Sequence, residues 1–124
     1  MTAWTDDELA TVGNTDELDI ASRRPDGSLR PYVTIWTVRL ADDLYVRSAH
    51  GHDNPWFQRA LAAADGRIRA GGIERDVAFE EPGSAVDADV DAAYHAKYDR
   101  YGARMVGTVV SPEAARSTLR LVPR

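Results

Sequence analysis

The apolar and polar positions at the start of the chain predict a short helix, a strand and a turn. Thr5 stands three residues before Glu8, the spacing of a capping box, in which a hydroxyl and a carboxylate bind backbone amides at a helix start. The helix should end near Asn14, and alternating apolar residues from Leu18 to Ser22 predict a strand. Pro25-Asp26-Gly27 then predicts a turn, because proline presets φ and glycine accepts a positive φ.

The segment from Arg30 to Leu40 predicts the most pronounced strand of the chain. It is rich in β-branched and aromatic side chains, and neither of its two alternating faces is fully polar. We therefore expect a central strand that is covered on both sides. A turn at residues 41–43 should connect it to a strand from Leu44 to Ser48, so that the two strands form a β-hairpin.

The middle of the chain predicts one helix and a second hairpin. Asn54-Pro55 suits the N-cap and the first position of a helix, which should run from Trp56 to Ala64. Gly71-Gly72 separates two strand-like segments, residues 67–70 and 73–80. Because a Gly-Gly pair suits a tight hairpin turn, these segments should pair with each other.

The last third predicts a long helix from Ala85 to Tyr101, with apolar residues at helical spacing. Met105 to Val110 predicts a strand, Ser111-Pro112-Glu113 a short helix, and Thr118 to Val122 a final strand. Roughly six or seven strands interrupted by isolated helices indicate an α+β fold, with an antiparallel sheet that closes or nearly closes into a barrel. We expect residues 1–124 to form a single domain.

Length and composition agree with one domain that has its own core. The chain has 124 residues, of which 44% are hydrophobic, so it needs no disulfide or structural metal to fold. It contains no cysteine, which excludes disulfides and thiolate nucleophiles. Its first residues are acidic and do not resemble a signal peptide, and no stretch approaches the roughly 18 apolar residues of a membrane span. We expect a cytoplasmic protein without a membrane partner.

The net charge of −5 argues against a nucleic-acid-binding protein, which would usually be basic. The charge is nevertheless uneven along the chain. Acidic residues crowd the first 20 positions and the stretch from Glu80 to Asp91, whereas arginines concentrate between Arg23 and Arg75. A GC-rich genome would explain why nearly all basic residues are arginine, but it does not explain why they concentrate in the middle of the chain.

The order of these signals from Ile20 to Phe79 resembles the split-barrel proteins that bind flavins and deazaflavins. Proteins of that group have, in this order, a basic turn, a strand with proline and tryptophan, a hairpin strand, a helix that starts with aromatic residues, and a further pair of strands. Within the group the chain resembles in particular the deazaflavin-dependent nitroreductase type and a short bacterial family of unknown function. The segments that carry the resemblance are Ser22-Arg23-Arg24-Pro25-Asp26-Gly27, Arg30-Pro31-Tyr32-Val33-Thr34-Ile35-Trp36, Leu44-Tyr45-Val46-Arg47-Ser48, Asn54-Pro55-Trp56-Phe57 and Arg67-Ile68-Arg69-Ala70-Gly71-Gly72.

The resemblance implies an antiparallel split β-barrel with a long helix in its C-terminal half and short capping helices. It also implies a bound deazaflavin coenzyme or FMN, and an oxidoreductase that reduces a small organic substrate. In such enzymes the cofactor supplies the hydride chemistry, so no acid–base pair has to be visible in the sequence, and no catalytic residue is assigned. The alternative is a cofactor-free split-barrel protein that binds a small anionic ligand or a protein partner.

Arg23, Arg24 and Arg30 are the first candidates for cofactor binding. A phosphate group needs fixed positive charge and forked donors, which the guanidinium group provides. Two arginines on a turn and one at the start of the next strand should converge at one rim of the barrel; the alternative is a solvated hairpin end. Arg47, two strands away, could join this cluster or point outward.

Trp36 and Trp56 are candidates for binding the ring of the cofactor, because pockets for flat apolar rings tend to be lined by aromatic side chains. Packing in the core is the alternative role. Ser48, at the end of the hairpin strand, and His50, in the following loop, complete the set of candidates. His50, His52 and Asp53 could also be metal ligands, but His95 is distant in the sequence and the chain has no cysteine, so no metal site is predicted.

We also expect the chain to form a homodimer. The predicted strand from Tyr32 to Leu40 is apolar on both faces, and a chain of this length has few residues with which to cover it. A symmetric dimer is the commonest closed oligomer. The expected partners are therefore a small-molecule ligand and a second copy of the chain.

Overall fold

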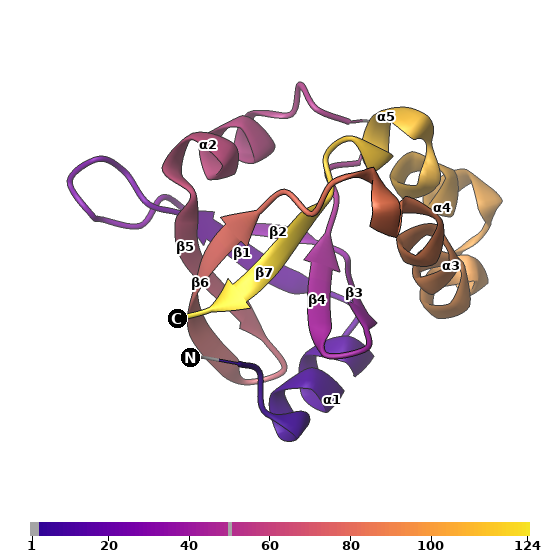
Figure 1. Ribbon diagram of the computed structural model, residues 1–124, viewed down its shortest axis with the longest axis horizontal. Helices are drawn as coiled ribbons and strands as arrows, with labels where there is room; N and C mark the ends of the chain where they lie inside the picture. Colours follow the sequence, from indigo (N-terminus) through magenta and orange to yellow (C-terminus); the bar gives the residue numbers. More distant parts are fainter. Residues whose placement is uncertain (1–2, 50) are drawn as a thin grey trace.

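Seven antiparallel strands form a rolled sheet in the computed structural model, which describes residues 3–49 and 51–124. The strands are β1 (Leu18–Ser22), β2 (Val33–Ile35), β3 (Thr37–Leu40), β4 (Asp43–Val46), β5 (Asp65–Ala70), β6 (Ile73–Glu80) and β7 (Leu119–Pro123). Their order is β2-β1-β5-β6-β7-β4-β3, so that β2 and β3 stand at the two ends (Figure 1). The predicted α+β fold with an antiparallel barrel is confirmed.

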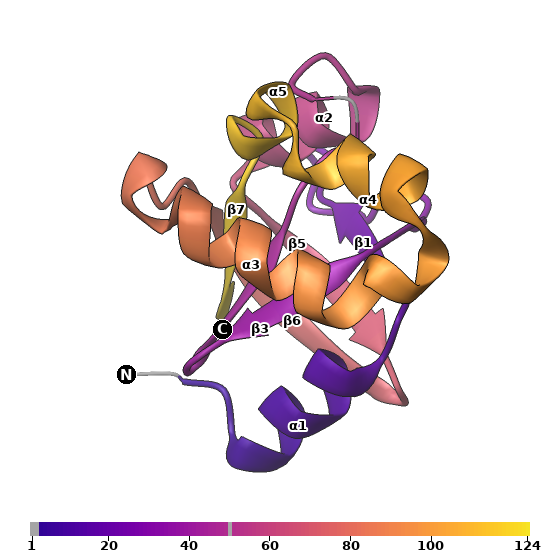
Figure 2. The same cartoon turned by 90° about the vertical axis from the view of Figure 1, so that its right-hand side faces the viewer.

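Helices cover one side and both ends of this barrel. Helices α3 and α4 lie across one side, α1 lies at one end, and α2 and α5 lie near the other (Figure 1, Figure 2). Among the described residues, no helix combines the length and the apolar character that crossing a membrane requires. The helices are α1 (Asp6–Asn14), α2 (Pro55–Ala63), α3 (Asp87–Tyr98), α4 (Ala103–Val110) and α5 (Pro112–Ala115), and 3₁₀ turns at Ser84–Val86 and Asp99–Tyr101 flank α3.

Three local signals have the structure that the sequence predicts. Thr5 Oγ1 accepts a hydrogen bond from the Glu8 amide at 3.1 Å, and Glu8 Oε1 accepts one from the Thr5 amide at 2.9 Å, which completes the capping box. Helix α2 begins at Pro55, although the Asn54 side chain makes no cap hydrogen bond with the described residues. Gly71-Gly72 turns between β5 and β6 with φ of 57° and 86°, as a tight hairpin turn requires.

The prediction of a central strand from Arg30 to Leu40 is wrong. The strand is interrupted at Trp36, and its two parts lie at opposite ends of the strand order. Strand β2 pairs with β1 whereas β3 pairs with β4, and one straight strand could not reach both partners. The bend at Trp36 therefore connects β2 at one end of the strand order to β3 at the other. Val33 is 37% exposed, so the segment is not covered on both sides.

The predicted strand from Met105 to Val110 is also wrong, because this segment belongs to helix α4. Val106 and Val109 are buried and stand three residues apart, whereas Met105 is 54% exposed. Valine favours a strand locally, but the spacing of the buried positions is helical. Both buried valines pack in a cluster with side chains of α3, and this tertiary contact stabilises the helix.

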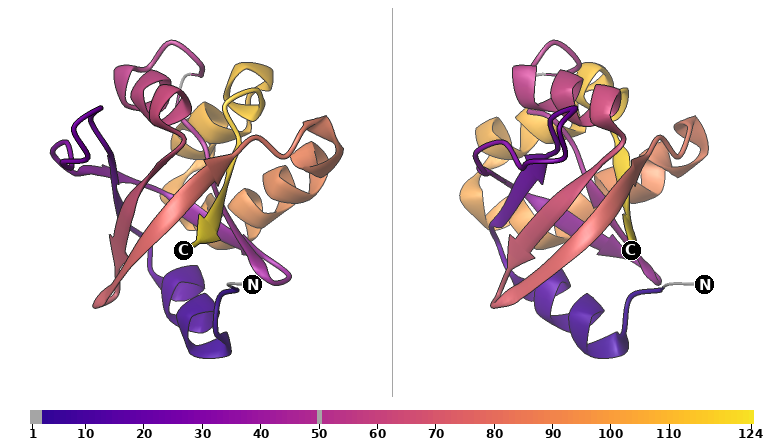
Figure 3. Two further views of the ribbon diagram at one scale, coloured as in Figure 1. Left: turned by 60° about the vertical axis from the view of Figure 1, so that its left-hand side comes forward. Right: turned by 90° about the vertical axis from the view of Figure 1, so that its left-hand side faces the viewer.

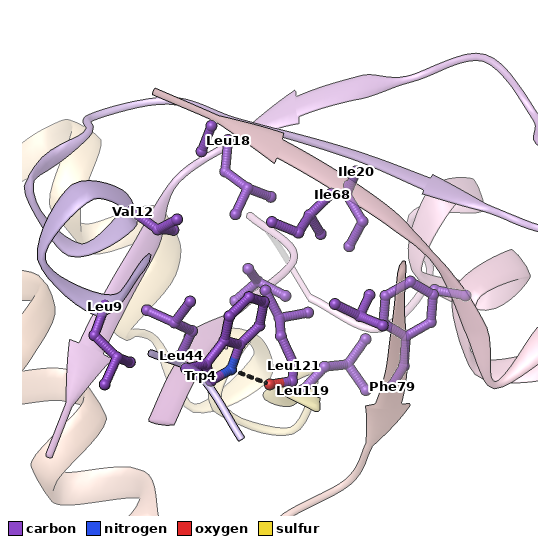
Figure 4. Close-up of a cluster of buried hydrophobic side chains, with 14 of the residues drawn as sticks. Trp4, Leu9, Val12, Leu18, Ile20, Leu44, Ile68, Phe79, Leu119 and Leu121 are labelled. Carbon is purple, nitrogen blue, oxygen red and sulfur yellow. Dashed lines mark hydrogen bonds between the residues drawn. The ribbon is translucent and has the colours of Figure 1, made fainter. Parts of the chain in front are cut away.

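Two apolar clusters form the core, one inside the barrel and one beneath α3 and α4. Inside the barrel, Trp4 Nε1 donates a hydrogen bond to the Leu121 carbonyl at 2.9 Å, so the buried indole nitrogen is paired (Figure 4). Each large side chain buried in this way contributes about 1.5–3 kcal/mol. The second cluster packs the sheet against α3 and α4 through Val38, Tyr45, Val90, Tyr94, Tyr98, Val106 and Val109.

Candidate functional site

A groove runs beside α2, along the turn between β1 and β2 and then along β2 itself. One cleft, between β2, α2 and α4, has a volume of about 330 Å³. A second, of about 600 Å³, is lined by the β1–β2 turn and by α2. Figure 3 shows this turn and this helix on the same side of the barrel. A narrow cleft of about 20 Å³ adjoins both, since it shares Val33 and Trp56 with the first and Arg30 and Arg59 with the second. We call the first cleft the aromatic end and the second the arginine end.

The aromatic end is lined by two tryptophans, one between β2 and β3 and one in α2. Trp36 lies at the bend between β2 and β3, and its ring stacks on Tyr98 with centroids 4.1 Å apart and planes inclined by 6°. Trp56 lies in the first turn of α2 and packs edge-on against Phe57. A flat apolar ring suits a cleft that is lined in this way. The other lining residues are Val33, Thr34, Ile35, Arg47, Ala49, Asn54, Met105, Thr108 and Val109.

The arginine end holds the three arginines of the predicted cluster, two of which bind protein groups. Arg23 Nη2 donates to Asp76 Oδ1 at 2.9 Å, and this carboxylate also accepts a bond from Arg67 at 2.9 Å. The bond from Arg67 is the main reason why the pKa of Asp76 lies below its ordinary value. Arg24 Nη1 donates to the Leu29 carbonyl at 2.9 Å, within the turn itself. The lining arginines are Arg23, Arg24, Arg30 and Arg59.

Arg30 differs from the other two because its bonding is incomplete. It lines both the narrow cleft and the arginine end. Its Nε is buried and has no hydrogen-bond partner among residues 3–49 and 51–124. A buried donor without a partner costs about 1–3 kcal/mol, so a rearrangement of Arg30 that gave this nitrogen an acceptor would recover this free energy. Arg59 reaches the same two clefts from α2 and forms no ion pair in the described part of the chain.

Arg47 neither joins the cluster nor points outward, so both placements expected from the sequence are wrong. Arg47 is only 1% exposed, and it lines the aromatic end. The guanidinium donates to the Asp91 carboxylate, to the Val109 carbonyl at 2.9 Å and to Thr118 Oγ1 at 2.8 Å. The neighbouring Ser48 is fully buried, and its amide donates to Ser117 Oγ at 2.8 Å. The sequence around Arg47 could not predict that its side chain is buried, because its bonding partners are distant in the sequence.

The histidines of the loop before α2 add little to this groove. His50, a sequence candidate for ligand contact, lies outside the described residues. His52 is exposed, and its Nδ1 lies 2.9 Å from Gln58 Nε2. No group of three or more possible metal ligands occurs among the residues that the structure describes.

A family model described as an uncharacterized protein conserved in bacteria, DUF2255, matches residues 8–121. This match includes every residue that lines the groove. The chain belongs to this family. The resemblance to a short bacterial family of unknown function, expected from the sequence, is therefore confirmed. A search of curated proteins found no significant match.

Several solved structures share the fold of this DUF2255 chain. A pyridoxamine 5'-phosphate oxidase-like protein from Listeria innocua superimposes with a TM-score of 0.64 at 12% identity, covering 96% of this chain and 92% of that one. A FAD-binding protein from Mesorhizobium loti gives 0.58 at 13%, with 99% and 92% covered. An F420 reductase gives 0.57 at 15%, with 93% and 90% covered. At these identities the likeness shows the fold, and the predicted split barrel is confirmed.

Arg59 is the principal groove residue of this DUF2255 chain that sequence reasoning missed. It follows Trp56 by three residues in a helix, so both side chains lie on the same face of α2. The two residues line the narrow cleft together. The helical spacing from a candidate tryptophan could therefore have identified Arg59.

Lys97 is the only lysine of the DUF2255 chain and lies outside the groove, in a cleft between α1, α3 and β3. Its Nζ donates to the Thr15 and Thr37 carbonyls, both at 2.7 Å. Burial lowers the pKa of Lys97 from 10.5 to about 8. The ammonium therefore connects the end of α1 to β3 while it is partly withdrawn from water.

We expect the stability of the protein to rise with pH between about 8 and 10 through Lys97. The folded pKa is about 8 and lies below the ordinary value of 10.5, so the unfolded chain binds more protons than the folded protein in this window. The free energy of unfolding therefore increases as the pH rises through it. Above about 10 the rise should reverse, because burial raises the pKa values of Tyr94 and Tyr98 above 10.0. Urea unfolding at several pH values measures the slope. Lys97→Met should flatten it, and an unchanged slope in that variant would contradict the assignment.

Proposed function

We propose that the groove binds a flavin-type coenzyme, FMN or a deazaflavin coenzyme, with its ring at the aromatic end and its phosphate at the arginine end. Such coenzymes join a flat ring to a charged tail. The groove likewise has an aromatic end and an arginine end, which supports this orientation. Forked guanidinium donors suit a phosphate, and indole walls suit a ring. Structures with this fold include an F420 reductase and a FAD-binding protein, which is in keeping with the proposal.

The buried Arg30 Nε is the observation that carries this proposal. This nitrogen is a donor without a partner among the described residues, and the residue that carries it lines a groove that holds further positive charge. Arg59 adds a guanidinium from the opposite wall, whereas Arg23 and Arg24 are partly satisfied by protein groups. The residues that are present therefore fit an anionic group at this position.

The chain's own contribution to a reaction would be binding and orientation. A bound flavin or deazaflavin supplies hydride transfer, and we propose reduction of a small organic substrate as the activity. Trp36 and Trp56 would exclude water from the two sides of the ring, and Arg30 and Arg59 would hold the tail. No side chain of the groove is assigned a proton-transfer role.

Arg30→Gln and Arg59→Gln should each weaken coenzyme binding about tenfold or more, because a hydrogen bond to a charged group contributes about 1.5–3 kcal/mol. Stability should change by less than about 0.5 kcal/mol for the exposed Arg59. Titrations of FMN and of the deazaflavin coenzyme at low and high salt measure both affinity and the electrostatic part of it. The salt dependence should decrease in each variant.

Arg69→Gln is the matched control for these titrations. Arg69 pairs with Asp19 at 3.0 Å, has a side chain that is 45% exposed, and lines a separate cleft. It should bind the coenzymes as the parent does. A parent protein that binds neither coenzyme, or Arg30 and Arg59 variants with parental affinity, would refute the proposed function.

A cofactor-free protein that binds a small anion is the second candidate. It is favoured by the bonds that tie Arg23 and Arg24 to protein groups, since these leave fewer free donors for a large coenzyme. Inorganic phosphate separates the two candidates. An anion-binding protein should bind phosphate as tightly as FMN, whereas a coenzyme-binding protein should prefer FMN because its ring reaches Trp36 and Trp56.

We further propose that the protein is a homodimer. Val33 and Met105 are 37% and 54% exposed, and both border the aromatic end. Strand β2 pairs with β1 on one edge only, within the described part of the chain. A second copy would cover these apolar side chains. Light scattering at micromolar concentration should give twice the mass of 13.6 kDa, and the mass of one chain would contradict the proposal.

A further inference from the structure

Three aromatic rings lead from the groove to the molecular surface. Trp36 borders the aromatic end and stacks on Tyr98, with ring centroids 4.1 Å apart and planes inclined by 6°. Tyr101 lies 5.6 Å from Trp36 and 6.2 Å from Tyr98, measured between centroids. Tyr98 is fully buried, whereas Tyr101 is 47% exposed. The rings therefore form a continuous contact from the groove wall to solvent.

The two phenols of this cluster donate to different kinds of acceptor. The Tyr98 hydroxyl donates to the backbone carbonyl of Asp16 at 2.7 Å, and burial raises the pKa of this phenol. A carbonyl is too weak a base to take the proton away. The Tyr101 hydroxyl instead donates to the side-chain carboxylate of Asp16, which can accept a proton from a strong acid. Among the described residues, the Tyr101 hydroxyl therefore has a carboxylate placed to receive its proton, whereas the Tyr98 hydroxyl donates to backbone carbonyls.

The carboxylate of Asp16 is held in this position by its other partner. Arg100 donates to the same carboxylate and also to the Lys97 carbonyl at 2.7 Å. The bond from Arg100 is the main cause, and the bond from Tyr101 the second, of the lowered pKa of Asp16. Asp16 is therefore ionised at neutral pH and is available as an acceptor beside Tyr101.

We propose that Trp36, Tyr98 and Tyr101 form a path that carries one-electron oxidation from the groove to the surface, with Asp16 as the proton acceptor. The Trp36 indole gives one electron to a small one-electron oxidant, such as an inorganic radical, that enters the groove, and the oxidant is thereby reduced. One electron then passes from the Tyr101 phenol to the indole, which returns to its original state. The oxidised phenol is a strong acid, so its O–H bond breaks and the proton moves to the Asp16 carboxylate.

Tyr98 takes part in this path as a stacked ring and keeps its proton. The net change is the oxidation of Tyr101 to a neutral phenoxyl radical, the reduction of the oxidant by one electron and the protonation of Asp16. Oxidising equivalents then leave the groove and reach an exposed residue, where a soluble reductant can meet them. The path consists of protein groups alone, so it stands whether or not the groove binds a coenzyme.

Pulse radiolysis with azide radicals tests the path on the protein without a coenzyme. The azide radical oxidises tryptophan and becomes azide, after which the decay of the tryptophan radical and the growth of the tyrosine radical are followed by absorbance. The parent should show a transfer phase whose rate is independent of protein concentration. Trp36→Phe and Tyr101→Phe should each lose this phase. Asp16→Asn should slow it and make its rate depend on the concentration of buffer base.

Two variants serve as matched controls in the same experiment. Trp56→Phe removes the other groove indole, which packs against Phe57, and Tyr32→Phe removes a phenol that lies against Arg69. Both should keep the transfer phase. Circular dichroism and melting confirm that each variant is folded, and Tyr101→Phe retains the aromatic ring. The proposal is overturned if the parent lacks the phase, if Tyr101→Phe retains it, or if Trp56→Phe loses it as Trp36→Phe does.

Discussion

Gly66→Ala should abolish the stable fold, with a loss of about 4 kcal/mol or more of unfolding free energy. Gly66 lies in β5 opposite Ser22 of β1. A methyl group at this position would come within 2.0 Å of the Ala21 carbonyl oxygen and 3.0 Å of Phe79 Cζ. The first of these is a backbone atom in a paired strand and cannot move aside without separating β1 from β5.

This close approach of β1 and β5 also positions the arginine end of the groove. The Arg23 amide, directly after β1, donates to the Asp65 carbonyl at 3.2 Å. A separation of the two strands would therefore displace the turn that carries Arg23 and Arg24. Urea unfolding measures the stability of the variant, and coenzyme or phosphate titration measures the groove.

Two other glycines provide controls for the Gly66 substitution. Gly72→Ala has open space around the new methyl group but a φ of 86°, so it should cost about 1–2 kcal/mol through the backbone alone. Gly107→Ala, in helix α4, also meets open space and has no positive φ, so it should stabilise the protein by about 0.5–1 kcal/mol. If Gly66→Ala costs no more than Gly72→Ala, the close strand approach is not a constraint.

Arg47→Met should destabilise the protein by about 3 kcal/mol, because removing one partner from a buried ion pair leaves the other groups without compensation. The guanidinium of Arg47 is fully buried and connects the end of β4 to α3, to α4 and to Thr118 just before β7. Its loss leaves the Val109 carbonyl and the Thr118 hydroxyl without this donor. The Asp91 carboxylate is 36% exposed and can regain water, which limits the cost.

A double-mutant cycle separates the ion pair from the packing of the Arg47 side chain. If Arg47 and Asp91 stabilise each other, Asp91→Asn should cost less in the Arg47→Met background than in the parent. Arg69→Met is the matched control, since its pair with Asp19 is solvent-exposed and should contribute less than about 1 kcal/mol. Equal stability of Arg47→Met and the parent would show that an apolar side chain can replace this network.

The local parts of the fold could be predicted because their causes lie within a few residues. The capping box of Thr5 and Glu8, the proline at the start of α2 and the Gly71-Gly72 turn depend on short-range hydrogen bonds and on backbone conformations that particular residues favour. The order of these elements, which resembles that of the split-barrel proteins, was sufficient to predict the split-barrel fold. The cluster of Arg23, Arg24 and Arg30 also followed, since a turn keeps its flanking residues close together.

The tertiary structure decided the features that depend on distant partners. Trp36 bends the chain because β2 and β3 pair with different strands, and the Met105–Val110 segment is helical because its valines pack on α3. Arg47 is buried because its partners approach from α3, α4 and β7. The groove itself unites residues of the β1–β2 turn, α2 and α4, and the free energy that holds them together comes from packing between segments that are far apart in the sequence.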